Sequence, residues 1–369
     1  MRTLVISDLH LGSRNAVDVL RRPAAREVLL ASLDGVDRLV VLGDLLELRH
    51  GPLHDALSVA LPVLREIGER LGPGSEVIVV PGNHDFRLVG SWLEWRSRDG
   101  AVALGLEDHA GPFASTGSSA IAEALGHATL DVVYPGIWLR DDVYATHGHY
   151  LDRHVTVPGF ERLASGVLGR LLGAPPERAA SPDDYEVVLA PMYAFLDAVA
   201  ERVGDGRAAA PGNASARAWT RLSGNGPRAW RARALAGAFP LGIAALNRAG
   251  IGPLKADLSG QELRRAALLA IGEVVGHLGI DARHVIFGHT HRSGPLPGDD
   301  LGEWQARGAS LLNTGCWVYE SMYLDRDWGS PYWPGGAAIV EDDGPPRFVR
   351  LLDGVGADAL RPQARPAPA

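Results

Sequence analysis

The feature that most constrains the fold is a series of short, almost uninterrupted apolar runs, each followed closely by polar side chains. Leu4–Ile6, Arg38–Leu42 and Val77–Val80 are three such runs in the first part of the chain. Runs of this length are typical of strands buried on both faces of a sheet. Between the second and third runs, apolar residues recur at helical spacing from Leu57 to Leu71. This alternation predicts an α/β layered fold.

Similar strand-like runs return near the C-terminus, so we expect a split core. Two of these runs lie at 130–133 and 142–146, and further runs follow at 284–287, 310–312, 337–340 and 348–352. We predict a core of residues 1–152 and 276–353, with residues 153–275 inserted between its halves. The Pro- and Ala-rich tail at 354–369 is expected to be disordered.

The insertion is predicted to be helical and irregular. Residues 173–183 have the composition of a linker, and Met192–Val203 is a candidate helix with Pro191 in its first turn. Ser259 and Glu262 form a capping-box pattern ahead of an apolar helical stripe.

Composition excludes several classes of protein. The chain has 369 residues and a net charge of −8, which argues against a broad basic face that grips nucleic acid. The single cysteine, Cys316, excludes a disulfide framework and a Cys-rich zinc module. We expect no secretory leader, since Met1-Arg2 runs directly into the first apolar run, and no apolar run reaches the roughly 20 residues of a membrane span. We therefore expect a cytoplasmic protein.

Five short polar motifs lie at or just beyond the ends of predicted strands, where open α/β sheets place their sites. They are Asp8-Leu9-His10, Gly43-Asp44 with Glu47 nearby, Gly82-Asn83-His84-Asp85, His147-Gly148-His149 and Gly288-His289-Thr290-His291. Each motif alone is weak, since a lone histidine is more often a surface or core residue than a ligand. Together their carboxylates, imidazoles and amide suit Mn, Fe, Co or Zn better than Ca. So many ligands suit two ions that share a bridging carboxylate.

Over the split core, the chain resembles the calcineurin-like metallophosphoesterase family. The likeness is carried by five motifs that occur in the family's order: SDLHLG, LGDLLE, PGNHDF, THGH and FGHTHR. The resemblance implies a sandwich of two mixed β-sheets flanked by helices, interrupted here by the long insertion. It implies one metal held by Asp8, His10 and His291. It also implies a second metal held by Asn83, His147 and His289, with Asp44 bridging the two.

The resemblance further implies two divalent metal ions, with manganese favoured and iron, zinc or cobalt as alternatives. A water between the two ions would lose a proton near neutral pH and attack the phosphorus. His84 would then face the phosphate, where it could stabilise developing charge or protonate the leaving group. Asp85 is the candidate to orient His84, although an N-cap or turn role is an equal alternative.

Two further residues, one inside a motif and one next to a motif, are candidates for the site. His149 could contact the leaving group or a phosphate oxygen, or only support the metal ligands. Arg292 could bind a phosphate through its guanidinium fork, and the alternative is an ordinary surface arginine.

Within the family, the chain is most similar to the branch that hydrolyses UDP-2,3-diacylglucosamine. GDLLE, GNHDF, GHTHR and Gly315-Cys316-Trp317 near Ser321-Met322 carry this likeness. Members of that branch carry Arg where this chain has His84, and HGD where it has His147-Gly148-His149.

The segment 206–256 of the insertion has an unusual charge. It contains no Asp or Glu and carries +8, so the remaining residues, with 28 basic and 44 acidic side chains, carry −16. It also holds Trp219, Trp230 and the apolar run Ala234–Asn247. Such a segment indicates an anionic membrane contact or a lipid pocket, with Arg231 and Arg233 as candidate substrate-binding residues. A cap that packs on the core and a nucleic-acid contact are the alternatives.

We therefore predict a phosphoesterase that hydrolyses a phosphodiester or pyrophosphate bond, in a nucleotide- or lipid-linked amphiphilic substrate. The alternatives are a nuclease or cyclic-nucleotide phosphodiesterase of the same fold, or a non-catalytic metal-binding scaffold. The expected partners are a phosphorylated small-molecule or lipid-linked substrate and a membrane surface. No stable complex with nucleic acid is expected.

Overall fold

The computed structural model describes residues 1–98, 100, 102–157, 160–174, 176–203, 243–244, 246–248, 251, 253–255, 259–321, 323–324 and 329–362. These residues divide between two compact units. The first unit comprises the described residues of Met1–His149, Tyr193–Ala210 and Ile280–Ala369, and the second those of Tyr150–Met192 and Pro211–Gly279.

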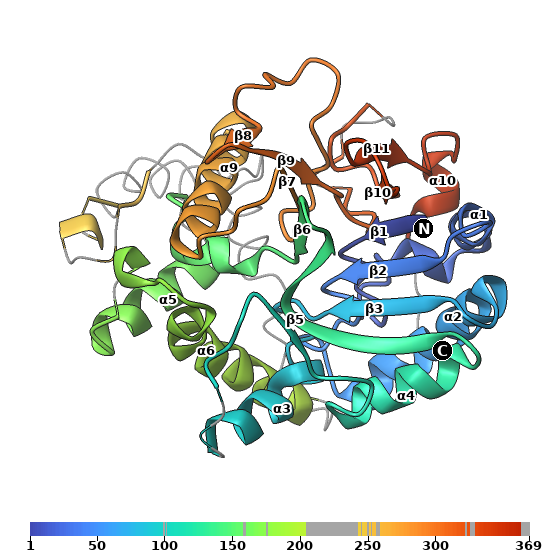
Figure 1. Ribbon diagram of the computed structural model, residues 1–369, viewed down its shortest axis with the longest axis horizontal. Helices are drawn as coiled ribbons and strands as arrows, with labels where there is room; N and C mark the ends of the chain where they lie inside the picture. Colours follow the sequence, from blue (N-terminus) through green and yellow to red (C-terminus); the bar gives the residue numbers. More distant parts are fainter. Residues whose placement is uncertain are drawn as a thin grey trace, which may run out of the picture. The chain divides into compact units, whose positions relative to one another are not determined.

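The first unit is built on one curled, mixed sheet (Figure 1). Its strands are β1 (Thr3–Ile6), β2 (Arg38–Leu42), β3 (Glu76–Val80), β4 (Glu107–His109), β5 (Thr129–Arg140), β6 (Val143–Thr146), β7 (His284–Phe287), β8 (Gln305–Ala306), β9 (Ala309–Asn313), β10 (Gly336–Val340) and β11 (Arg347–Arg350). Their order is β11-β10-β1-β2-β3-β5-β6-β7-β9-β8, and β4 pairs with β5.

Strand β5 joins the two halves of this sheet. Its first residues pair in parallel with β3, and its last residues pair in antiparallel with β6. Strands β1, β2 and β3 are parallel to one another, as are β6, β7 and β9. The expected mixed α/β fold is confirmed, and the two sheets implied by the resemblance are halves of one continuous sheet.

Helices cover the sheet of the first unit (Figure 1). They are α1 (Pro23–Ser32), α2 (Leu53–Leu71), α3 (Arg87–Arg98), α4 (Thr116–Leu125) and the short α10 (Ala357–Leu360), with the 3-10 turn η1 (Val19–Arg21) before α1. The second unit contains α5 (Phe160–Leu171), the 3-10 turn η3 (Pro176–Arg178) and α9 (Gly260–His277). The turn η2 (His149–Arg153) and helix α6 (Pro182–Val203) each span the boundary between the units.

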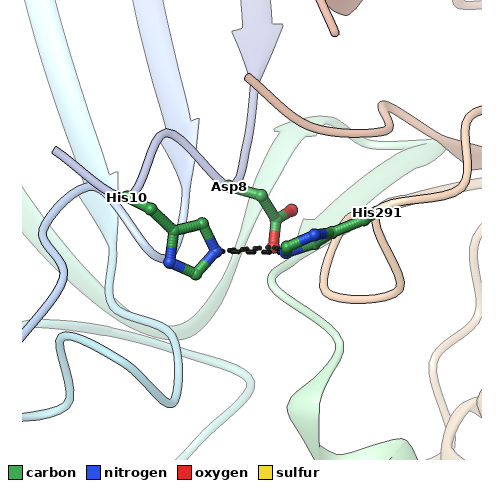
Figure 2. Close-up of side chains that lie close together, drawn as sticks. All are labelled: Asp8, His10 and His291. Atoms are coloured by element: carbon green, nitrogen blue, oxygen red, sulfur yellow. Dashed lines mark hydrogen bonds and ion pairs between the residues drawn. The ribbon is translucent and has the colours of Figure 1, made fainter. Parts of the chain in front are cut away.

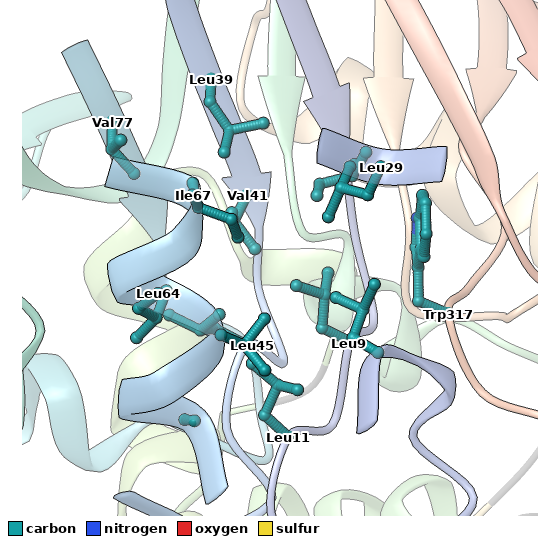
Figure 3. Close-up of a cluster of buried hydrophobic side chains, with 14 of the residues drawn as sticks. Leu9, Leu11, Leu29, Leu39, Val41, Leu45, Leu64, Ile67, Val77 and Trp317 are labelled. Carbon is teal, nitrogen blue, oxygen red and sulfur yellow. The ribbon is translucent and has the colours of Figure 1, made fainter. Parts of the chain in front are cut away.

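Both faces of β2 are buried, which explains its uninterrupted apolar sequence. Leu39 and Val41 pack toward the helices, in the cluster that contains Leu64 and Ile67 of α2 (Figure 3). Val40 and its neighbours on β1 and β3 instead belong to a second cluster, formed with residues of β5, β6, β7 and β9. The second cluster fills the space between the two halves of the sheet and holds the ends of their strands in place.

Two expectations outside the sheet need correction. Helix α6 begins at Pro182, ten residues earlier than expected, and Pro191 lies inside it. The Asp184 carboxylate accepts hydrogen bonds from the backbone and hydroxyl of Ser181, which starts the helix there. The expected disordered tail contains α10, because Leu360 is fully buried in the core. No described helix is both long enough and apolar enough to cross a membrane.

Candidate metal centre

The predicted metal ligands lie in the turns that follow five strands. Asp8 follows β1, Asp44 follows β2, Asn83 follows β3, His147 follows β6 and His289 follows β7. Backbone hydrogen bonds tie the first two turns together, from Asp8 N to the Gly43 carbonyl (3.1 Å) and from His10 N to the Asp44 carbonyl (2.7 Å). The parallel strands therefore deliver these side chains to one edge of the sheet.

The backbone is strained at most of these positions. Seven described non-glycine residues have a positive φ, and five of them are predicted ligands. These five are Asp8 (55°), His10 (46°), Asp44 (53°), His289 (66°) and His291 (59°). Such a conformation costs on the order of 1–3 kcal/mol per residue and clusters at functional sites. Its concentration on the predicted ligands points independently to a site here.

Asp8, His10 and His291 form the first ligand group (Figure 2). His291 Nε2 lies 3.3 Å from Asp8 Oδ1 and 3.1 Å from His10 Nε2. The Asp8 carboxylate is fully buried, and its Oδ1 accepts no hydrogen bond from the described residues. A carboxylate oxygen and two imidazole nitrogens thus converge on one point, as the ligands of an ion do.

Asn83, His147 and His289 form the second group. Asn83 Oδ1 lies 3.0 Å from His147 Nε2 and 3.1 Å from His289 Nδ1, and these two nitrogens are 3.2 Å apart. His147 Nδ1 donates to the Leu42 carbonyl (2.8 Å), so its Nε2 presents a lone pair toward Asn83.

The Asn83 amide has two hydrogen-bonding orientations at this place. With its oxygen toward the imidazole nitrogens, it could bind an ion together with them. In the reversed orientation, its NH2 would donate to both imidazoles and its oxygen would accept from Arg49, which satisfies all of these groups without an ion.

Asp44 lies between the two groups. Its Oδ2 is 3.6 Å from His10 Nε2 in the first group and 3.6 Å from His147 Nε2 in the second. A carboxylate equidistant from both sets of ligands is suited to bridge two ions. The residues present therefore fit a pair of divalent metal ions.

Charge at the site is concentrated on buried groups. Burial would raise the pKa of Asp44, but the imidazoles of His147, His84 and His10 hold it far below its ordinary value. Burial would lower the pKa of His10, yet the Glu47 and Asp44 carboxylates raise it to about 10. A cation that binds His10 must therefore displace a proton, so metal affinity should increase with pH.

Glu47, rather than Asp85, contacts His84. The Glu47 carboxylate lies 3.0 Å from His84 Nδ1, and its Oε2 also lies 3.1 Å from His10 Nδ1. The Asp85 carboxylate instead accepts hydrogen bonds from the backbone of Gly82, Asp44, Leu45 and Leu46. The expectation that Asp85 orients His84 is therefore corrected, because the backbone amides of two turns occupy its carboxylate.

His149 lies behind the ligands. It is 1% exposed, its ring lies 5.5 Å from that of His147, and its Nε2 is 3.1 Å from the Tyr134 hydroxyl. Burial holds the pKa of His149 well below its ordinary value, so it is neutral near pH 7. This placement favours the supporting role over contact with the leaving group.

Of the three predicted substrate-binding arginines, only Arg292 lies within the described residues. The Arg292 guanidinium is held by both carboxylate oxygens of Asp299 (2.9 and 2.6 Å) and lies over the Trp304 ring. Arg231 and Arg233 lie outside the described residues. So does most of segment 206–256, on which the membrane prediction rests.

Arg49 was not singled out from the sequence, yet it lies next to His84. Its Nε donates to the Asn83 carbonyl (3.1 Å), and its Nη1 is 3.4 Å from His84 Nε2. Its position two residues after Glu47, in the turn that carries Asp44, could have suggested it.

Comparison with known proteins gives one informative match. The family model described as calcineurin-like phosphoesterase matches residues 1–206, more than half of the chain. No curated protein matches the sequence.

Two solved structures show weak likenesses. The cold-active protein-tyrosine phosphatase of a psychrophilic Shewanella species has 11% identity and a TM-score of 0.29, over 92% of this chain and 75% of that one. Another crystal structure has 12% identity and a TM-score of 0.32, over 95% and 98% of the two chains.

Proposed function

This chain belongs to the calcineurin-like phosphoesterase family, whose members are metal-dependent phosphoric ester hydrolases, and we propose that it cleaves a phosphodiester or pyrophosphate bond. The observation that carries the proposal is the position of Asp44. One buried carboxylate oxygen lies 3.6 Å from an imidazole nitrogen of each ligand group. Centres with two adjacent ions stabilise both the attacking and the leaving oxygen of an in-line displacement.

The side chains divide the work at this centre. When bound, two divalent ions, with manganese as our first choice, would polarise the phosphoryl group and make a water nucleophilic near neutral pH. One ion would be held by Asp8, His10 and His291, and the other by Asn83, His147 and His289. Asp44 would bind both ions.

His84 is suited to donate a proton to the leaving oxygen. Glu47 accepts a hydrogen bond from His84 Nδ1–H, which leaves Nε2 as the atom that would donate the proton. Burial lowers the pKa of His84, and the negative charge of Glu47 opposes this shift and so favours the protonated form. The Arg49 guanidinium beside His84 Nε2 is placed to bind a phosphate oxygen.

The proposed substrate is amphiphilic, with a nucleotide or a lipid next to the phosphate. The charge of segment 206–256 supports this choice, because a +8 segment with tryptophans and an apolar run suits an anionic surface. We also propose that the protein associates with membranes through this segment. Sedimentation with anionic liposomes tests the association, and salt-insensitive or absent binding would refute it.

The central test is His84→Ala in protein loaded with Mn²⁺. We expect two bound ions by elemental analysis and a loss of about 10²- to 10⁴-fold in kcat with bis-p-nitrophenyl phosphate. His54→Ala is the matched control, because the His54 side chain is 81% exposed. Loss of both ions in His84→Ala, or unchanged turnover, would contradict the assignment.

A substrate panel tests the specificity. Nucleotide-diphosphate lipids, glycerophosphodiesters, cyclic nucleotides and single-stranded DNA should be compared at equal concentration with Mn²⁺. We expect the amphiphilic diphosphates to be preferred. Preferential cleavage of DNA or cyclic nucleotides would overturn the substrate proposal and leave the metal centre standing.

A further inference from the structure

The last part of α6 presents three polar side chains to the site region of the first unit. Tyr193, Asp197 and Glu201 are spaced by four residues, so they lie along one face of the helix. These residues belong to the insertion in sequence but to the first unit in structure.

The two outer members of this face show what it packs against. The Tyr193 ring lies 5.4 Å from the Arg49 guanidinium, 5.5 Å from the Phe86 ring and 5.7 Å from the His149 ring. One turn beyond Asp197, Glu201 forms an ion pair with Arg87 at the start of α3. Asp197 therefore faces the region between Arg49 and Arg87, next to the turn that carries Asn83 and His84.

The Asp197 side chain is buried but has no hydrogen bond from the described residues. It is 9% exposed, and its Oδ1 is fully shielded and without a partner there. Leaving a buried carboxylate oxygen unpaired is costly, so such groups are normally matched by a donor. Arg87 pairs with Glu201, and Arg49 donates to the Asn83 carbonyl.

The electrostatics around Asp197 agree with this placement. Burial raises the pKa of Asp197, the positive charges of Arg49 and Arg87 oppose this shift, and the negative charges of Glu47 and Glu201 add to it, so that the pKa is about 7. Asp197 thus lies within electrostatic range of the groups that surround His84. Two guanidinium groups nearby disfavour a cationic ligand, so a neutral donor is the better match.

We propose that Asp197 accepts a hydrogen bond from a hydroxyl group of the substrate, beside the phosphoryl group, and that the enzyme prefers phosphoesters of polyols. Carboxylates bind sugar hydroxyls in this way elsewhere. The inference rests on the proposed phosphoesterase function and adds the class of alcohol attached to the phosphorus.

The test uses two p-nitrophenyl phosphodiesters that share a leaving group and differ only in their hydroxyls. One is the glyceryl ester and the other is the propyl ester. We expect wild-type protein with Mn²⁺ to favour the glyceryl ester by about 10- to 100-fold in kcat/KM, the size expected for a hydrogen bond to a charged group. In Asp197→Ala the ratio should fall to about one, and Asp197→Asn, which keeps an acceptor oxygen, should retain part of the preference.

Glu201→Ala is the matched control, one turn away on the same face. It should keep the wild-type ratio, and an equal collapse there would show that Asp197 acts only through the position of α6. A binding readout supports the kinetics: glycerol 3-phosphate should stabilise wild-type protein against heat more than propyl phosphate does, and Asp197→Ala should lose this difference.

The outcomes separate the inference from the proposed function. Equal hydrolysis of both esters by wild-type protein would overturn the role of Asp197 and leave the phosphoesterase intact. Hydrolysis of neither ester would count against the proposed function itself.

Discussion

Gly82 allows a direct test of the bridging carboxylate, because a single methyl group there would meet it. A Cβ on Gly82 would lie 2.3 Å from Asp44 Oδ1 and 2.8 Å from His147 Nε2. Gly82 is not among the residues with positive φ, so alanine fits the backbone and the substitution acts by contact alone. Ordinary contacts of a Cβ begin at 3.4 Å, so Asp44 must move by about 1 Å.

A displacement of this size exceeds what a metal site tolerates. Bonds between Zn²⁺ and a carboxylate oxygen are about 2.0–2.2 Å long, and metal sites in proteins keep such distances within about 0.2 Å. A misplacement of about 1 Å costs on the order of 100-fold in rate. We therefore expect Gly82→Ala to bind about one ion or fewer per chain and to lose about 100-fold or more in kcat/KM. Overpacking should also reduce the free energy of unfolding by about 1–3 kcal/mol.

The assay combines elemental analysis of Mn²⁺-loaded protein with hydrolysis of bis-p-nitrophenyl phosphate. Gly260→Ala is the control, because a Cβ there has no atom within 4 Å and its φ is not positive. Gly82→Ala protein that keeps two ions and activity within a few-fold of wild type would refute the assignment of Asp44 as the bridge.

Three further predictions concern Glu47, Asp85 and His154. Burial lowers the pKa of His84 and the negative charge of Glu47 opposes this shift, so Glu47→Gln should lower that pKa further and move the alkaline limb of the pH profile of kcat/KM to lower pH; an unshifted limb would contradict a role of Glu47 in keeping His84 protonated. Asp85→Ala should lower the free energy of unfolding by about 3 kcal/mol or more, measured in urea, since it leaves several buried amides unpaired; a change below 1 kcal/mol would contradict this. Burial lowers the pKa of His154 to about 3, so only the unfolded chain gains its proton between pH 6.5 and 5, and stability should fall by about 2 kcal/mol over that range. His154→Gln should remove this part of the loss of stability at low pH. If the urea midpoints at pH 6.5 and pH 5 differ as much in the variant as in the wild type, another group causes the loss.

The central strands of the sheet were largely predictable from the sequence, because they are buried on both faces. The runs Arg38–Leu42 and His284–Phe287 coincide with β2 and β7 residue for residue. Helices that combine apolar and polar faces were harder to place. Helix α3, which begins directly after the Asn83–Phe86 turn, was not predicted from the sequence.

The candidate ligands were predictable as a set, since each follows a strand that ends at one edge of the sheet. The different roles of Glu47 and Asp85 were not predictable, because adjacency in sequence made Asp85 a candidate partner of His84 and equally a turn residue. In three dimensions the turn points Asp85 at backbone amides and leaves His84 to a carboxylate 37 residues away. The position of Asp197 was not predictable from the sequence for a similar reason, since α6 and Arg49 are far apart in sequence and are brought together only by folding.

The long insertion takes the place of a connection that the sheet requires in any case. Strands β6 and β7 are parallel neighbours, and parallel neighbours need a crossover of a dozen or more residues. Cutting the chain within this crossover would leave two pieces, each contributing whole strands to a shared sheet. Each ligand group also draws on both pieces, with His291 and His289 from the second and the remaining ligands from the first. Divalent ions would then link the two fragments through ligands from each. The enzyme is therefore a candidate for a split reporter whose reassembly depends on metal.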